Sequence, residues 1–232
     1  MYTASTSTFT VLTWNIKIMD AFYPRYQTIA KQICETNADV VCLQEISVIG
    51  WHCMCDILKN QYVAVFDSPL RANSTYRTYG EIILLKNGSF TISNKGFFLL
   101  PSKMGRSVQW ACIENNSGEK CVIATGHLEN GVKNQEFRSQ QWKKIESEFS
   151  GLTEPFVWVG DVNMEHSELG PTYGKLVSFG DTYFGHRFGY EGKGAYDRAW
   201  TVKKNVSLLN RMGVDSDDLE LSDHDGLLIQ IS

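Results

Sequence analysis

The chain has 232 residues, of which 43% are hydrophobic and 21% are charged. These percentages are close to the averages of soluble globular proteins and exclude a disordered or fibrous chain. No apolar run approaches the roughly 20 residues needed to cross a bilayer, which excludes a transmembrane protein. The net charge of −4 predicts that any nucleic acid is bound through a local basic groove or at a strand end, because a protein that coats a duplex is usually basic.

The first predicted strand, Phe9–Trp14, precedes a helix at Tyr23–Asn37 and a strand at Val40–Leu43. The helix places apolar residues on one side, and its position between two strands predicts a βαβ unit. A second helix is predicted at Asn134–Phe149. Further short runs of β-branched and aromatic residues between turn residues predict strands. They are Ile82–Leu85, Val108–Ile113, Val122–Ala124, Phe156–Val159, Ala199–Val202 and Leu227–Ile231, with a hairpin loop at 115–119.

No repeat, linker or low-complexity tract interrupts this pattern, so residues 1–232 are predicted to form a single domain. The six cysteines are scattered, and His52-Cys53-x-Cys55 has no second Cys/His pair to complete a zinc site. Buried free thiols are the main prediction, with zinc or a disulfide as the alternative. Free thiols and a polar N-terminus without a secretory leader predict a reducing, intracellular compartment, in the nucleus or the cytoplasm.

Polar residues of a kind that buried sheets disfavour lie at the ends of five predicted strands. They are Asn15, Glu45, His127, Asp161 with Asn163, and Asp223 with His224. Each has an ordinary structural explanation when taken singly, as a turn, a cap or a solvated strand end. Their repeated position at strand borders predicts that one rim of the fold collects them into a site.

The chemistry of this set suits a phosphate ester. Glu45 and Asn15 are hard oxygen ligands, which Mg²⁺ prefers. Asp161 could activate a water molecule that Asn163 positions, and His224 could stabilise charge on phosphoryl oxygens. A histidine in this role needs a carboxylate to orient it, and both Asp197 and Asp223 are candidates. The two candidates are not separable at this point.

Five short motifs follow one another along nearly the whole chain. They are Thr13-Trp14-Asn15-Ile16, Leu43-Gln44-Glu45, Gly126-His127-Leu128-Glu129, Gly160-Asp161-x-Asn163 and Ser222-Asp223-His224. Their order resembles that of the endonuclease/exonuclease/phosphatase superfamily. A narrower resemblance rests on Pro101-Ser102-Lys103-Met104-Gly105-Arg106, Arg138-x-x-Gln141 and Asp181-Thr182 before Tyr196-Asp197-Arg198. These elements are similar to those of the 5′-tyrosyl-DNA phosphodiesterases.

That resemblance implies a four-layer α/β sandwich, with two facing mixed or antiparallel sheets flanked by helices. It implies Mg²⁺-dependent hydrolysis, with Mn²⁺ as a substitute, of the 5′-phosphotyrosyl bond that joins a topoisomerase-type adduct to DNA. The implied partners are DNA 5′ ends carrying a tyrosyl or peptide adduct, with RNA ends as an extension. A monomer without a membrane partner is expected.

The resemblance also implies roles position by position. Glu45 is the metal ligand with Asn15 beside it, Asp161 aligns the water, and Asn163 contacts the scissile phosphate. His127 and His224 hold phosphate oxygens, with Asp197 as the expected partner of His224 and Asp223 as a further catalytic residue. Substrate binding is assigned to Tyr79, Arg106, Arg138 and Tyr196, the last by stacking on a terminal base.

Three residues depart from the family pattern. Lys17 replaces an aspartate near the metal, Glu165 replaces an arginine, and Gly180 replaces a tryptophan. Two rival functions therefore stay open. One is another superfamily reaction, such as that of an abasic-site endonuclease, a 3′-exonuclease or deadenylase, or a phosphoinositide phosphatase. The other is a catalytically decayed module that binds DNA ends.

Overall fold

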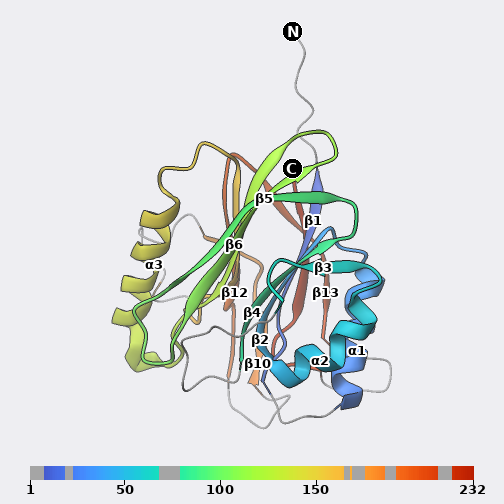
Figure 1. Ribbon diagram of the computed structural model, residues 1–232. Helices are drawn as coiled ribbons and strands as arrows, with labels where there is room; N and C mark the ends of the chain where they lie inside the picture. Colours follow the sequence, from blue (N-terminus) through green and yellow to red (C-terminus); the bar gives the residue numbers. More distant parts are fainter. Residues whose placement is uncertain are drawn as a thin grey trace.

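Two six-stranded β-sheets lie face to face, and helices cover their outer faces, as Figure 1 shows for the computed structural model. The structure describes residues 8–18, 23–67, 79–164, 168, 176–185, 192–213 and 221–232. This layering confirms the predicted four-layer α/β sandwich. None of the helices in the described ranges has the length and apolar character of a membrane span.

The first sheet has the strand order β13-β14-β1-β2-β4-β3. Its strands are β1 (Phe9–Asn15), β2 (Val40–Ser47), β3 (Tyr62–Ala64), β4 (Tyr79–Lys86), β13 (Val206–Met212) and β14 (Gly226–Ile231). β1 and β2 are parallel, which confirms the βαβ unit, and the other neighbours are antiparallel.

The second sheet has the order β5-β6-β7-β8-β12-β9. Its strands are β5 (Phe90–Leu99), β6 (Ser107–Asn115), β7 (Lys120–His127), β8 (Phe156–Asp161), β9 (Leu176–Ser178) and β12 (Asp197–Val202). β7 and β8 are parallel, and the other neighbours are antiparallel. The predicted hairpin at 115–119 joins β6 to β7, and all eight predicted strands are confirmed.

Helices α1 (Tyr23–Thr36) and α2 (Val48–Leu58) lie on the first sheet, and α3 (Gln135–Phe149) lies on the second after a 3-10 turn at Val132–Asn134 (Figure 1). The sequence predicted α1 and α3 but not α2. The α2 segment is apolar almost throughout, so no polar stripe marks it as an amphipathic helix. Ser47 caps it, because its Oγ accepts the backbone N–H of Gly50 at 2.9 Å.

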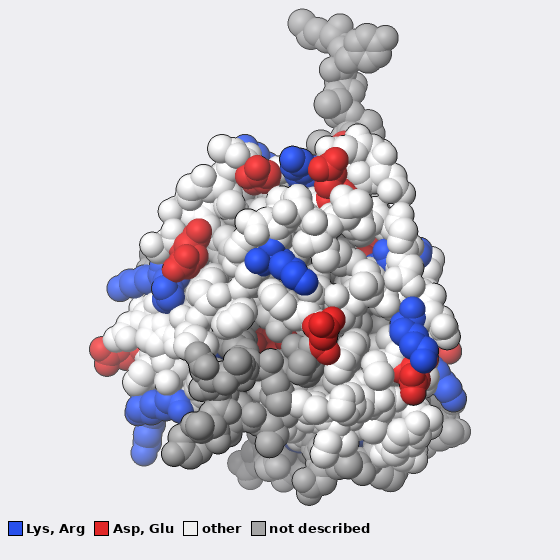
Figure 2. All heavy atoms as spheres, in the orientation of Figure 1, with Lys and Arg blue, Asp and Glu red and all other residues white. Residues whose placement is uncertain are grey.

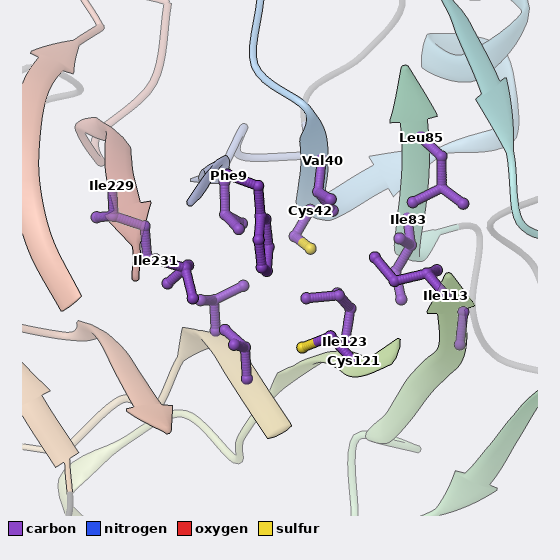
Figure 3. Close-up of a cluster of buried hydrophobic side chains, with 14 of the residues drawn as sticks. Phe9, Val40, Cys42, Ile83, Leu85, Ile113, Cys121, Ile123, Ile229 and Ile231 are labelled. Atoms are coloured by element: carbon purple, nitrogen blue, oxygen red, sulfur yellow. The ribbon is translucent and has the colours of Figure 1, made fainter. Parts of the chain in front are cut away.

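The alternation of side chains along each strand divides the apolar residues between three cores. Between the sheets, Phe9, Ile83, Ile123 and neighbouring aliphatic side chains point toward one another (Figure 3). Val11 belongs to this core, whereas the next residue, Leu12, belongs to the core beneath α1 and α2. A third core lies beneath α3. Because both faces of the central strands are covered, a polar side chain of these strands reaches solvent at the ends of the sandwich.

The parallel pairs bring four polar strand ends to one end of the sandwich. β1 and β2 finish together, and so do β7 and β8, while β4, β12 and β14 begin at this end because they are antiparallel to them. A third, two-stranded sheet of β10 (Tyr183–Phe184) and β11 (Lys193–Gly194) is added here. In Figure 1 this end lies at the bottom, near the label β10, whereas the C-terminus lies at the top.

Candidate active site

Asp161 ends β8, and its carboxylate is 1% exposed. Its Oδ2 accepts a hydrogen bond from Asn15 Nδ2 at 2.9 Å, and its Oδ1 accepts one from the backbone N–H of Asn163 at 2.8 Å. Burial and the charge of Asp197 raise the pKa of Asp161 to about 6, although His224 opposes the shift. Such a carboxyl group is ionised at neutral pH and is basic enough to take a proton from water.

His224 lies before β14 and is paired with Asp197, whose Oδ2 is 2.8 Å from Nδ1. Asp197, not Asp223, therefore orients the ring, which decides between the two candidates. The other nitrogen, Nε2, lies 3.6 Å from Asp161 Oδ2. Burial alone would lower the pKa of His224, but the charges of Asp197 and Asp161 outweigh it and raise the pKa to about 10. His224 is thus a cation at neutral pH, suited to bind an anion.

His127 ends β7 on the other side of Asp161. Its Nε2 lies 3.3 Å from Asp161 Oδ2 and 2.8 Å from the Asn163 side-chain amide. Its Nδ1 lies 2.5 Å from Nη1 of the buried Arg106. A guanidinium group only donates hydrogen bonds, so Nδ1 accepts from Arg106, while Nε2 faces the Asp161 carboxylate and Nδ2 of Asn163. Arg106 therefore orients the His127 ring with Nε2 toward the cluster.

Glu45, near the end of β2, has the character of a metal ligand. Its Oε2 accepts the backbone N–H of Ile18 at 2.9 Å, and its Oε1 lies 3.7 Å from His127 Nδ1. The Asn15 amide is held beside it, since its Oδ1 accepts the backbone N–H of Lys17 at 3.0 Å. A single partly exposed carboxylate fits Mg²⁺, which keeps several waters and uses one or two carboxylates. Among the residues described, no group of three or more His, Cys, Asp and Glu side chains forms a closed metal cage.

Backbone strain gathers at this end of the sandwich. Five non-glycine residues in the described ranges have positive φ, and three of them are Lys17 (49°), Glu45 (58°) and Asn163 (49°). Each such conformation costs of the order of 1–3 kcal/mol and persists only where surrounding contacts hold it. These three strained conformations lower the stability of the fold but orient the three side chains, which is typical of functional sites.

Asp223 forms an ion pair with Lys17 and does not form the alternative pair with His224. Its Oδ2 lies 2.7 Å from Lys17 Nζ, and both side chains are largely buried, with exposures of 11% and 15%. The Lys17 substitution thus comes with a local partner for its charge. Asp223 is placed at the site through this ion pair, next to His224 in the chain, and no contact assigns it a direct part in proton transfer.

Sequence reasoning quoted Glu129 within a motif but missed its role. This fully buried carboxylate accepts hydrogen bonds from Ser102 Oγ (2.5 Å), Lys103 N (3.0 Å), Met104 N (3.1 Å) and Gln141 Nε2 (3.4 Å). The signal was present, because an acidic residue two positions after a strand-end histidine needs partners if it is buried. Glu129 organises the whole Ser-Lys-Met segment.

A chain of contacts joins Glu129 to the site. The Ser102 hydroxyl that donates to Glu129 also accepts the backbone N–H of Arg106 at 2.9 Å. Arg106 in turn contacts His127. The Ser-Lys-Met-x-Arg element is therefore a brace that positions Arg106 and, through it, the His127 ring.

The remaining predicted residues are placed differently. Arg138 lies outside the cluster: its guanidinium pairs with Glu168 at 2.6 Å and donates to the carbonyls of Glu129 (3.0 Å) and Gly131 (2.8 Å), so it supports the turn before α3. Tyr79 begins β4 at the site end of the sandwich and is half-buried. Tyr196, also half-buried, immediately precedes Asp197. Their roles in substrate binding stay predictions.

Of the other two departures from the family pattern, Glu165 falls outside the described residues. Gly180 has φ of +81°, and a Cβ there would lie 3.3 Å from Nη2 of Arg211. Lysine, arginine and acidic residues are interspersed over the face seen in Figure 2, with no continuous basic area among the residues coloured there.

This fold and this convergence of a carboxylate, two histidines, two amides and a candidate metal ligand define a class of phosphoester-hydrolysing proteins. The family model described as "Endonuclease/Exonuclease/phosphatase family" matches residues 12–224, and the chain belongs to this family. No curated protein matches the chain significantly in sequence.

Solved structures share the fold at low sequence identity. Truncated TDP2 from Caenorhabditis elegans is 18% identical, with a TM-score of 0.79 over 97% of both chains. TDP2 from D. rerio, complexed with a single-strand DNA product, is 17% identical, with a TM-score of 0.82 over 98% of this chain and 100% of that one. The human Nocturnin catalytic domain, with a bound sulfate anion, is 18% identical, with a TM-score of 0.73 over 97% and 94%.

Proposed function

We propose that the protein is a Mg²⁺-dependent phosphodiesterase that hydrolyses 5′-phosphotyrosyl bonds at DNA ends and so removes topoisomerase-type adducts. The observation that carries this proposal is the meeting of Asn15, Asn163, His127 and His224 around Asp161, with contacts of 2.8 to 3.6 Å to its carboxylate, beside Glu45. The similarity to TDP2 structures, one of them with a single-strand DNA product, supports the choice of substrate.

In the proposed reaction, Asp161 takes the proton of a water molecule that attacks the phosphorus in line with the tyrosyl oxygen. Asn15 holds the carboxylate by its Nδ2–H, and the Asn163 amide fixes the path of the water. The protonated His224 donates to the phosphoryl oxygens as negative charge grows on them, and His127 contacts these oxygens through Nε2. Electrostatic stabilisation of this kind supplies much of the rate enhancement in phosphoryl transfer.

Glu45 would hold the magnesium ion, with the side-chain oxygen of Asn15 beside it and Mn²⁺ as a substitute. When bound, the ion polarises the phosphate and neutralises charge on the leaving oxygen. Lys17 and Asp223 border this position as an ion pair. This ion pair contributes no net charge at the metal position. Asp223 together with the aspartate that Lys17 replaces would contribute −2.

The proposed partners are DNA 5′ ends with a tyrosyl or peptide adduct, with RNA ends as an extension, acted on by a monomer. Six free cysteines are consistent with work in a reducing, intracellular compartment. We further propose that residues 1–232 act as one catalytic domain.

Turnover of a 5′-tyrosyl oligonucleotide, with Mg²⁺ and after EDTA treatment, tests the proposal. We expect turnover that EDTA abolishes and Mg²⁺ restores. Asp161→Asn should lower turnover by about 10²–10⁴-fold, the usual contribution of a general base, without loss of thermal stability. Lys59→Gln, which changes an exposed ion pair with Asp56, is the control and should behave as wild type. Wild-type protein inert on this substrate would overturn the proposal, and near-normal turnover by Asp161→Asn would overturn the assignment of the base.

The rival family reactions are separated by the same assay with other substrates. The likeness to Nocturnin keeps these rivals relevant, and cleavage of polyadenylate, an abasic duplex or a phosphoinositide in place of the tyrosyl strand would establish one of them. A decayed binding module would hydrolyse none of these. It would also show no saturable Mg²⁺ or Mn²⁺ binding in calorimetric titration.

A further inference from the structure

A β-bulge in β2 turns the side chain of Glu45 toward the site. The pairing of β2 with β4 shifts register between Leu43 and Ile46, so that β2 contains one extra residue there. Leu43 and Ile46 both belong to the core beneath α1 and α2. In an uninterrupted strand the side chain of Glu45 would lie on this same face, because successive alternate residues share a face. With the bulge, Glu45 has φ of 58° and is partly exposed beside His127.

Gln44, the other residue of the bulge, points between the two sheets. Its side-chain amide is fully buried and donates from Nε2 to Thr125 Oγ1 of β7 at 2.9 Å. The same nitrogen lies 3.2 Å from Thr13 Oγ1 of β1 and 3.2 Å from the carbonyl oxygen of Cys42, two residues earlier in β2. Gln44 therefore joins the parallel pair β1–β2 of the first sheet to the second sheet.

The residue of β4 that lies opposite the bulge, Glu81, is also held from the second sheet. Glu81 is buried, and its Oε2 accepts a hydrogen bond from the Ser107 hydroxyl of β6 at 2.9 Å. Its backbone carbonyl accepts one from Nε2 of the buried Gln109, also in β6, at 2.5 Å. Both strands that form the bulge are thus fixed by hydrogen bonds from side chains of the second sheet.

We propose that these contacts form a clamp between the two sheets that positions Glu45 for a metal ion. The inter-sheet clamp consists of Thr13, Gln44, Glu81, Ser107, Gln109 and Thr125. Gln44 is its central positioning residue, because it contacts three strands and is the immediate neighbour of Glu45. The inference rests on the proposed function, since it takes Glu45 as the residue that would hold Mg²⁺.

The inter-sheet clamp lies directly beneath the site. Gln44 immediately precedes Glu45, and Thr125 precedes His127 by two residues. Glu45 belongs to the first sheet and His127 to the second, and Oε1 of the one lies 3.7 Å from Nδ1 of the other. The separation of the metal side from the phosphate side therefore depends on how the Gln44–Thr125 hydrogen bond holds the two sheets together.

The choice of cation offers a way to separate positioning from stability. Mg²⁺ demands near-ideal octahedral coordination, whereas Ca²⁺ accepts longer and more variable distances. A loosened Glu45 should therefore lose affinity for Mg²⁺ more than for Ca²⁺. A general loss of stability would instead reduce the amount of folded protein and leave the ratio of the two affinities unchanged.

Thr125→Val tests the inter-sheet clamp, because valine has the shape of threonine and lacks the hydroxyl that Gln44 contacts. Calorimetric titration of the metal-free protein with Mg²⁺, and separately with Ca²⁺, provides the affinities. We expect Thr125→Val to bind Mg²⁺ about 10-fold more weakly than wild type, with a smaller loss for Ca²⁺. Thr125→Ser retains the hydroxyl and should match wild type. Gln44→Leu removes all three contacts and should lose up to about 100-fold.

Gln61→Leu is the matched control. Gln61 is also hydrogen-bonded through its amide, which lies 3.0 Å from Asn37 Oδ1, but Asn37 precedes the start of β2, at the opposite end of the strand from Glu45. This variant should match wild type in both titrations. Urea unfolding of every variant establishes that it is folded under the conditions of the titration.

The outcomes distinguish this inference from the proposed function. Wild-type Mg²⁺ affinity in both Thr125→Val and Gln44→Leu overturns the inter-sheet clamp and leaves the proposed function intact. A loss that is the same for Mg²⁺ and Ca²⁺ also overturns it, because Gln44 would then serve stability alone. A wild-type protein that binds neither cation overturns the metal site and the clamp together. The expected affinities in a protein that does not cleave tyrosyl strands would retain the clamp and reject the proposed reaction.

Discussion

Ionisation of Asp161 and His224 sets the pH range of the proposed reaction. Asp161, whose pKa is raised to about 6 chiefly by burial, must be deprotonated, and His224, whose pKa is raised to about 10 by Asp197 and Asp161 against its own burial, must be protonated. We therefore expect kcat/KM to rise as the pH increases through about 6 and to fall as it approaches about 10.

Replacement of Asp197 tests the alkaline limb. Asp197→Asn removes the charge that most strongly raises the pKa of His224, so the alkaline limb should move to lower pH, and NMR titration of the histidine should show the same shift. The pair also links stability to pH. Its stabilisation is complete below the unfolded-state pKa of about 6.5 and is lost as the pH rises through about 10, so the wild-type advantage over Asp197→Asn should shrink there. An unmoved alkaline limb would assign it to another group.

Glu129 provides a prediction about positioning. Glu129→Ala leaves the partly buried donors of Ser102, Lys103 and Met104 without their acceptor, and we expect a loss of about 1–3 kcal/mol of unfolding free energy in urea denaturation. Catalysis should fall as well, because Arg106 loses its brace. Glu146→Ala on α3 is the matched control and should change neither quantity appreciably. Full activity in a destabilised Glu129→Ala protein would show that the brace serves stability alone.

At the scale of elements, the parallel pair β7–β8 depends on two facing glycines. Gly126 and Gly160 are paired in register, and a Cβ on Gly160, at φ of +154°, would overlap the carbonyl oxygen of Gly126. Backbone cannot move aside as a flexible side chain does. Gly160→Ala should therefore cost at least about 3 kcal/mol of stability, the sum of overpacking and backbone strain.

The control for this prediction is Gly151→Ala after α3, where a Cβ would meet nothing within 4 Å. Thermal and urea unfolding of both variants provide the measurement. Equal stability of the two would mean that β7 and β8 can separate without penalty. Because His127 and Asp161 follow these glycines directly, the same contact sets the distance between the two side chains.

The elements that sequence reasoning missed have several physical causes. β3, β9, β10 and β11 are two or three residues long, too short for a pattern to show. β5 and β13 are edge strands with mostly exposed side chains, so burial does not select apolar residues along their whole length as it does in the central strands. α2 is the opposite case, since it is apolar almost all round and shows no helical stripe. Gly50, Met54 and Leu58 form the buried side of α2, but apolar residues such as Ile49 also lie on its exposed side, so its sequence shows no contrast between the two sides.

At the scale of the whole molecule, the net charge of −4 predicts weak salt dependence of strand binding. A single strand held by two or three phosphate contacts should show a slope of log affinity against log salt of about −1.4 to −2.1. Binding of the 5′-phosphorylated product strand between low and moderate salt provides the measurement. A slope steeper than about −4 would reveal a basic groove and contradict binding at the strand end alone.

The order of the polar motifs along the chain sufficed to predict the family, the sandwich and the set of residues at one end of it. These features follow from local pattern, because strand-forming runs and the residues that end them are contiguous in sequence. Which of those residues are partners depended on the tertiary structure. Asp197 rather than Asp223 meets His224, and Arg138 turns away to Glu168. Hydrogen bonds between residues up to 210 positions apart depend on ångström-scale strand register and sheet packing, which no local pattern encodes.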